Sequence, residues 1–447
     1  MQRNTDAHIT PAPWRLPLLS ALLSLAVIAL LGLLLRWTFV SPVAWVNYKF
    51  LLHAHSHVAL LGWLYPVLFI ALLHAYLPPE IRNKKVYFRQ FWLAQAAVLG
   101  MLLSFPVQGY AAVSITFSTV HILLSYWFIL RFLKDARAQP INSKKHSLSF
   151  RFVKAALFFL ALSSLGPWAM GPIMATGHSG TALYYNAIYF YLHFLYNGWF
   201  TFAVLGLLFW LLEKYSISFN RKHGLLFFRL MFWACLPAYL LSVLWVKPDA
   251  IVYMLGGAAA LTQVLALALL LWQLWPIRKQ VRTLFSGWGS GLLILSALAF
   301  ILKTLMQFST AFPYMANLAY NIRHFIIGYL HLVLIGFVSF FILAWLAQQG
   351  WLSLRQRFSR CGISLFILAF VGSEALLFGQ GLFYWLGLGA IPGYNELLFG
   401  ISVFLPVGIL LFFAAQIWHR PTDAKACPEA LQGIGEGLKS YAAAEKH

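Results

Sequence analysis

The strongest constraint on this chain is a series of twelve apolar segments, each long enough to cross a membrane as a helix. A spanning helix needs about 20 apolar residues. Of the 447 residues, 61% are hydrophobic and 10% are charged, whereas roughly 25% are charged in an ordinary soluble domain. A soluble protein cannot bury so much apolar surface, so the sequence predicts an all-α, polytopic membrane protein. The predicted spans are roughly 14–40, 48–77, 86–109, 112–133, 150–173, 182–212, 224–246, 249–275, 286–309, 317–348, 361–386 and 393–418.

These spans form one predicted transmembrane domain, 14–418, between an N-terminal tail, 1–13, and a C-terminal tail, 419–447. The apolar run at 14–40 is too long for the core of a cleaved signal peptide, so we expect it to be the first span. We identify no internal repeat, and the three cysteines form no CxxC pair.

The charges predict how the chain crosses the membrane. The formal net charge is +21, a balance that in a soluble protein suggests nucleic acid. Here the basic residues lie between the apolar segments, and 27 of the 32 Lys and Arg fall on one side of the predicted topology. Basic loops stay in the cytoplasm. We therefore expect cytoplasmic termini, contact with membrane lipid and no nucleic-acid partner.

The histidines are concentrated on even-numbered spans. Each lies about 5 to 15 residues after its span begins, which places all of them at one depth in the outer half of the membrane. Histidines from several helices at one depth indicate a haem or metal layer. The alternative is that each one hydrogen-bonds a neighbouring helix. These residues are His53, His55 and His57 on the second span, His121 on the fourth, His193 on the sixth, and His324 and His331 on the tenth.

Three further charged residues fall within or beside predicted spans. Glu374 in the eleventh span and Lys303 in the ninth could each serve a proton path or pair with a polar group. Arg323, at the start of the tenth span, suits either a haem propionate or an anchor at the membrane interface. His324 could likewise meet a propionate or a loop, and His53 could be solvated.

Twelve spans with outer-half histidines on the second, sixth and tenth resemble subunit I of the heme–copper oxidase superfamily. The resemblance is closest to the C-family cytochrome oxidases and the bacterial nitric oxide reductases. It implies a low-spin haem held between the second and tenth spans, with His331 as one ligand. The other ligand is His57 by its spacing to Pro78, as in the reductases, or His55 by comparison with other oxidases of the family.

The sequence departs from this family at the catalytic centre. His193 matches one copper ligand, but Trp245-Val-Lys-Pro248 is not followed by the expected histidine pair. Tyr329 stands where the family has the ligand of the high-spin haem. The resemblance therefore implies one b haem and argues against copper, with Tyr329, His121 or His324 as substitute ligands if a second haem binds.

These observations predict an oxidase-like haem protein of the bacterial inner membrane that acts in electron transfer or in handling nitric oxide or oxygen. Its electron donor would be a cytochrome c or a quinol, because the chain has no CxxCH motif for haem c. A partner subunit is also consistent with the resemblance. Two alternatives stay open: an active oxidase or nitric oxide reductase with an altered centre, and a transporter of haem, metal or a small solute without bound haem. No catalytic residue is assigned.

Overall fold

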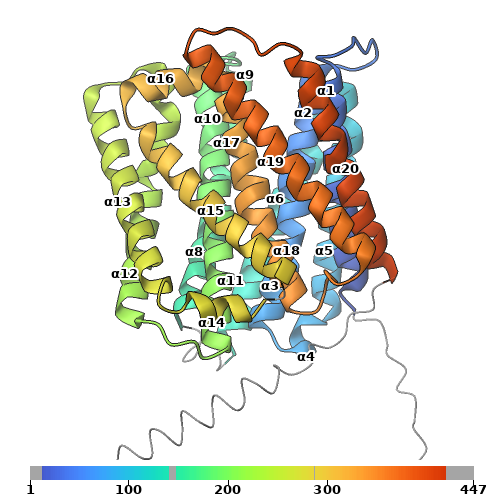
Figure 1. The fold of residues 1–447 in the computed structure, drawn as a ribbon, viewed down its shortest axis with the longest axis vertical. Coiled ribbons are helices and arrows are strands. Elements are labelled where there is room, and N and C mark those ends of the chain that lie inside the picture. The colour runs from blue at the N-terminus through green and yellow to red at the C-terminus, as the bar shows by residue number, and fades with distance from the viewer. Residues whose placement is uncertain (1–12, 140–146, 286, 419–447) are drawn as a thin grey trace, which may run out of the picture.

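The structure, a computed structural model, describes residues 13–139, 147–285 and 287–418. The predicted tails lie outside these ranges, apart from Pro13. Across the described ranges the secondary structure is helical and includes no strand. Twelve helices are long and apolar enough to cross a membrane, which confirms the predicted all-α bundle (Figure 1).

Most spans are continuous helices whose ends agree with the predicted segments to within a few residues. They are α1 (Arg15–Trp37), α5 (Lys85–Gln108), α6 (Ala112–Arg137), α13 (Ala250–Leu274), α15 (Gly287–Ser309), α19 (Arg357–Trp385) and α20 (Tyr394–Trp418). The fifth span joins α8 (Ser147–Ser163) to α9 (Leu165–Ala175), and the seventh joins α12 (Arg221–Cys235) to the 3-10 segment η3 (Pro237–Val246). Short helices α4 (Pro79–Arg82), α14 (Arg278–Thr283) and α16 (Pro313–Asn321) lie between spans.

The second, sixth and tenth spans each consist of two α-helices separated by a π-helical segment. They are α2 (Tyr48–His57), η1 (Val58–Leu64) and α3 (Tyr65–Tyr76); α10 (Ala182–His193), η2 (Phe194–Phe200) and α11 (Thr201–Lys214); and α17 (Arg323–His331), η4 (Leu332–Ser339) and α18 (Phe340–Gln348). In all three spans the π segment begins directly after a histidine. Such segments often lie at functional sites.

These three spans pack against one another. The indole nitrogen of Trp63 donates a 2.8 Å hydrogen bond to Ser339 Oγ, which joins η1 to η4. The Tyr76 hydroxyl donates to the carbonyl of Gly206 at 3.2 Å, and the rings of Trp210 and Trp345 lie 5.7 Å apart. The second, sixth and tenth spans therefore form the centre of the bundle, and most of the other spans surround them.

The three central spans also share a sequence pattern that the sequence analysis missed. In each, a histidine is followed five residues later by glycine and six residues later by an aromatic residue. The first copy runs from His57 to Gly62 and Trp63, the second from His193 to Gly198 and Trp199, and the third from His331 to Gly336 and Phe337.

The glycines of this pattern are sites of close helix approach. A Cβ added at Gly62 would lie 2.9 Å from a methyl group of Val98, and at Gly198 it would lie 2.5 Å from Phe159 Cβ. At Gly336 it would lie 2.9 Å from the ring of Phe370. Small residues allow such close packing between membrane helices. The shared pattern therefore recurs on every fourth span, at positions where the central helices pack closely.

The tenth span differs from its predicted bounds of 317–348. Residues 313–321 form the separate helix α16, and the span itself begins at Arg323. The break is at Ile322, whose extended backbone (φ −101°, ψ 92°) cannot continue a helix. The hydrophobic pattern runs through this break, so the sequence alone did not show it.

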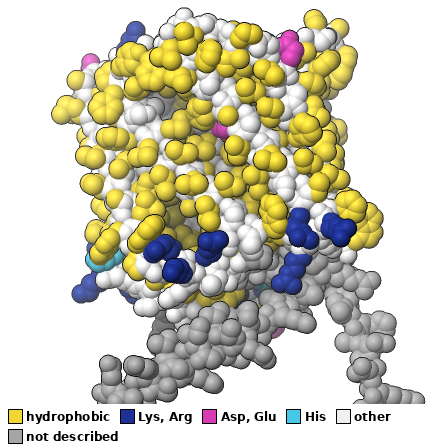
Figure 2. Space-filling view, viewed as in Figure 1, with side chains coloured by type: hydrophobic (Ala, Val, Ile, Leu, Met, Phe, Trp, Pro, Cys, Tyr) yellow, Lys and Arg dark blue, Asp and Glu magenta, His cyan; other side chains and the backbone are white. Residues whose placement is uncertain are grey.

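Charged side chains are distributed unevenly over the surface. Figure 2 shows hydrophobic side chains over most of the visible face, with Lys and Arg gathered mainly at the end of the bundle where α14 lies. The Arg15 guanidinium, at the start of α1, donates to the carbonyl of Ile417, at the end of α20. The first and last spans therefore start and finish at the same end of the bundle.

Candidate functional site

A cluster of ionisable groups from different helices lies beside the central spans. The Nδ1 atom of His331 on α17 lies 3.7 Å from a carboxylate oxygen of Glu374 on α19. Arg36 on α1 is in electrostatic range of Glu374, His331 and His55, and His55 is in range of His331. The Arg36 guanidinium also donates to the hydroxyl of Ser402 on α20. The structure therefore brings His55, His331 and Glu374 together with Arg36.

The two histidines of this cluster each have Nδ1 towards an oxygen atom. His55 Nδ1 lies 3.1 Å from the backbone carbonyl of Ile28. Because a carbonyl oxygen can only accept, Nδ1 carries the proton and Nε2 has a free lone pair. His331 Nδ1 faces the Glu374 carboxylate. Within the described ranges, neither Nε2 atom makes a hydrogen bond. A histidine whose Nδ1 faces a carbonyl or carboxylate is the usual arrangement for a metal ligand.

The space beside these imidazoles is partly open. The His331 side chain retains 26% of its exposure although it lies in a central span. His55 is likewise only half-buried. Both imidazoles of the cluster are therefore partly accessible.

His57 has different surroundings. Its Nδ1 faces the carbonyl of His53 at 2.9 Å, and its Nε2 lies 3.3 Å from the Tyr110 hydroxyl. Its ring packs 4.3 Å from that of Phe105 on α5. Both nitrogens of His57 are therefore engaged on the α5 side, and the structure places His55, rather than His57, near His331.

His53 on α2 and His121 on α6 lie beside His57. The ring of His53 packs 4.6 Å from Tyr110. His121 is buried, in electrostatic range of His57, with its ring 4.8 Å from Tyr65. Its Nε2 is buried with no hydrogen-bond partner among the described residues. These residues form a group separate from His55 and His331.

His193, the counterpart of a copper ligand, is also fully engaged. Its Nε2 faces the carbonyl of Cys235 at 2.9 Å, and its Nδ1 lies 3.2 Å from the side-chain amide nitrogen of Asn197. Lys303 is buried within electrostatic range of it and lies 5.8 Å from the Phe300 ring. The described part of the chain contains no group of three or more His, Cys, Asp or Glu side chains arranged to hold a metal ion.

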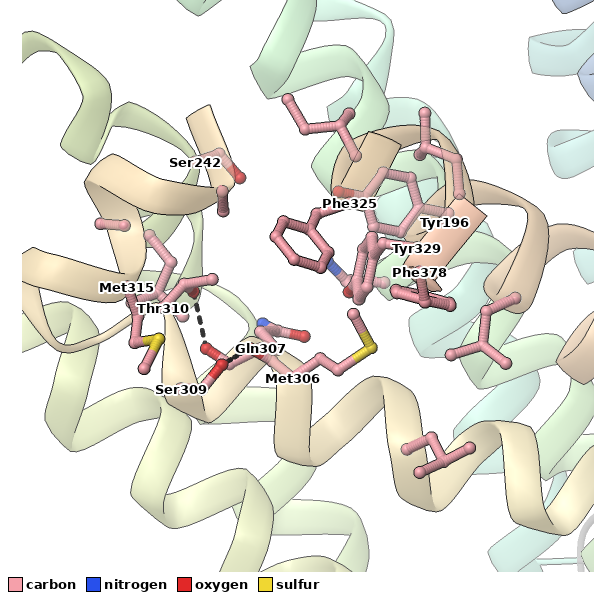
Figure 3. Close-up of a pocket in the computed structure, with 18 of the residues that line it drawn as sticks. Tyr196, Ser242, Met306, Gln307, Ser309, Thr310, Met315, Phe325, Tyr329 and Phe378 are labelled. Carbon is pink, nitrogen blue, oxygen red and sulfur yellow. Dashed lines mark hydrogen bonds between the residues drawn. The ribbon is translucent and has the colours of Figure 1, made fainter. Parts of the chain in front are cut away.

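Tyr329 lines a large cavity between the sixth, seventh, ninth, tenth and eleventh spans (Figure 3). The cavity volume is about 840 Å³, within the range of roughly 300–1,000 Å³ typical of small-molecule sites. Glu374, His193 and Gln307 also line it. Tyr329 is thus on the cavity side of α17, and the ring of Tyr196 lies 6.2 Å from its own.

The two residues at the start of the tenth span belong neither to the ionisable cluster nor to the lining of the cavity. Arg323 is exposed and is in electrostatic range of Tyr189. His324 packs between the rings of Tyr384 and Tyr394, at 5.5 Å and 5.3 Å.

Two polar residues that the sequence analysis did not select are part of this region. Arg36 was counted only as one of the few charges on the outer side, although it ends a span that has no other charge after Arg15. Gln307, in the ninth span, is buried, and both atoms of its amide have no hydrogen-bond partner in the described structure. Each could have been found as a polar residue within an otherwise apolar segment.

No known family model matches the chain, and no curated protein matches it significantly in sequence.

Proposed function

We propose that this protein binds one b-type haem between α2 and α17, with His55 and His331 as axial ligands, and transfers electrons in the membrane. The observation that carries the proposal is the pair of imidazoles on neighbouring helices, each with Nδ1 facing an oxygen and Nε2 free. When bound, haem iron alternates between the ferric and ferrous states and so accepts or releases one electron.

The residues around the histidines suit this role. The Ile28 carbonyl holds the ring of His55 through a hydrogen bond, and the Glu374 carboxylate lies 3.7 Å from His331 Nδ1. Arg36 faces Glu374 and so compensates its charge in the bundle interior. With His55 and His331 both as ligands, the haem would supply one-electron transfer rather than bind a gas, which favours electron transfer over the handling of nitric oxide or oxygen.

The charge distribution supports an orientation of the bundle in the membrane. Basic residues gather at one end of the bundle, and the positive-inside rule assigns that end to the cytoplasm. We therefore place both termini in the cytoplasm of a bacterial cell and the haem in the outer half of the inner membrane. A quinol or a cytochrome c would supply the electrons.

The test is the haem content of the full-length protein purified from haem-replete cells. A pyridine haemochrome assay should give one b haem per chain, lost in His55→Ala and in His331→Ala. His57→Ala is the matched control, because it removes an imidazole from the same helix and should keep the haem. Size-exclusion profiles in detergent verify that all three variants are folded.

Three results would overturn the proposal. A colourless protein would leave the transporter alternative. Two haems per chain would favour an oxidase or reductase with a second iron at Tyr329. Loss of haem in His57→Ala, with retention in His55→Ala, would move the ligand to the other face of α2.

A further inference from the structure

The cavity beside Tyr329 combines apolar walls with two buried polar side chains that make no hydrogen bond within the described residues. Gln307 is 6% exposed and both its amide nitrogen and its amide oxygen lack a hydrogen-bond partner among the described residues. Glu374 is 7% exposed, and neither of its carboxylate oxygens accepts a hydrogen bond there. Buried polar groups are almost always paired. Two such groups on the wall of one cavity point to a ligand that supplies the missing partners.

The aromatic residues of the cavity favour a flat ligand. Figure 3 shows the rings of Phe325, Tyr329 and Phe378 close together, with Gln307 and Met306 on α15 facing them. Aromatic rings pack well against another planar ring, and a methionine sulfur adapts to its edge. These two walls therefore favour a planar ring.

The charges of the cavity favour a neutral ligand. None of the residues described as lining it is Lys or Arg. The two propionates of a haem would have no cation to pair with here, and His193 has both ring nitrogens engaged. A phospholipid phosphate would likewise have no cation to pair with in this cavity. The lining suits a neutral ring with polar atoms at its edges and an apolar tail.

We propose that this cavity binds the ring of a quinol, with the Gln307 amide at one ring oxygen and Glu374 towards the other. A quinol ring is neutral, flat and oxygenated at opposite edges, and its tail can lie against leucines such as Leu298 and Leu302. This assignment selects the quinol from the two electron donors considered above. Quinol binding in this cavity does not depend on the haem, whereas the role of the quinol as electron donor rests on the proposed haem site.

Glu374 connects this site to the candidate haem ligand. It lines the cavity, and its carboxylate lies 3.7 Å from His331 Nδ1. A quinol that becomes a quinone releases two electrons and two protons. A haem held by His331 would accept one electron, so the two electrons of one quinol would require two haem-loaded protein molecules. Glu374 accepts one proton from the ring hydroxyl, and the second passes to solvent.

The binding test uses decylubiquinone as the probe and tryptophan fluorescence as the readout, because Trp245 lines the cavity. Quenching should saturate in the wild-type protein. Gln307→Leu should weaken binding about tenfold, the loss expected from removing a hydrogen-bonding group of the site. The matched control is Gln90→Leu on α5, since Gln90 is also buried with both amide atoms unpaired but does not line the cavity.

The donor role is tested by anaerobic reduction of the haem with decylubiquinol. Glu374→Gln keeps the shape of the site but cannot accept the proton, so it should slow haem reduction at saturating decylubiquinol at least tenfold. Wild-type binding in Gln307→Leu, or equal weakening in Gln90→Leu, would overturn the quinol site. Absence of haem with intact quinone binding would overturn only the haem proposal, and haem without saturable quinone binding would overturn only this inference.

Discussion

Gly198 offers a quantitative test of the central packing. It lies in η2, on the sixth span, where a Cβ would come within 2.5 Å of Phe159 Cβ and 2.6 Å of its Cγ. Real Cβ atoms do not approach this closely, so Gly198→Ala forces α8 and the sixth span apart. Overpacking of this kind costs about 1–3 kcal/mol. Alanine also favours a helix over glycine by roughly 0.5–1 kcal/mol, which offsets part of the loss.

A control variant measures the gain in helix preference separately. Gly400 lies in α20, and a Cβ added there would meet nothing within 4 Å. Gly400→Ala should therefore show only the gain in helix preference. The difference in the free energy of unfolding between the two variants isolates the overpacking, and we expect about 1–3 kcal/mol.

The assay is reversible unfolding in mixed micelles of a mild detergent and dodecyl sulfate, followed by tryptophan fluorescence. Gly198→Ala should unfold at a lower fraction of dodecyl sulfate than the wild type, and Gly400→Ala at an equal or higher fraction. Equal stability of the two variants would refute the close approach of α8 to η2, and with it this part of the repeated pattern.

Three further predictions concern the site, the core and the topology. Glu374→Ala removes the carboxylate that faces His331 Nδ1, so haem affinity should fall by about 10–100-fold in a titration of the apoprotein with hemin; unchanged affinity would show that Glu374 does not orient the ligand. Trp63→Phe removes the hydrogen bond to Ser339, so it should lower the free energy of unfolding by about 0.5–1.5 kcal/mol. Phenylalanine is chosen because Phe337 stands at the same place in the third copy of the pattern. Trp63→Phe and Ser339→Ala together should lower the free energy of unfolding by less than the sum of the two single losses, because both remove the same hydrogen bond, and strict additivity would argue against a direct bond. A green fluorescent protein fused after His447 should fluoresce and an alkaline phosphatase fused there should be inactive, since the C-terminus is expected in the cytoplasm; the reverse would invert the topology.

The sequence by itself determined the number of spans and nearly all of their bounds. Membrane crossing depends on the length of an apolar run, which is a property of the chain alone. The prediction failed at Ile322, because a change in backbone direction leaves the apolar pattern intact. The threefold pattern of histidine, glycine and aromatic residue was also present in the sequence. Its meaning became clear only when three π segments in the structure began at the same position of that pattern.

The tertiary structure decided which histidine faces which neighbour. His55 and His57 are two residues apart, so they point to opposite sides of α2, and an apolar helix gives no clue to its own rotation. That rotation is set by packing, with Ile28 beside His55 and Phe105 against His57. Arg36 and Glu374 interact although they are hundreds of positions apart in the chain. Gln307 is tens of positions from the aromatic residues of the same cavity. Such contacts depend on how the twelve helices pack together. The sequence of a single helix does not predict them.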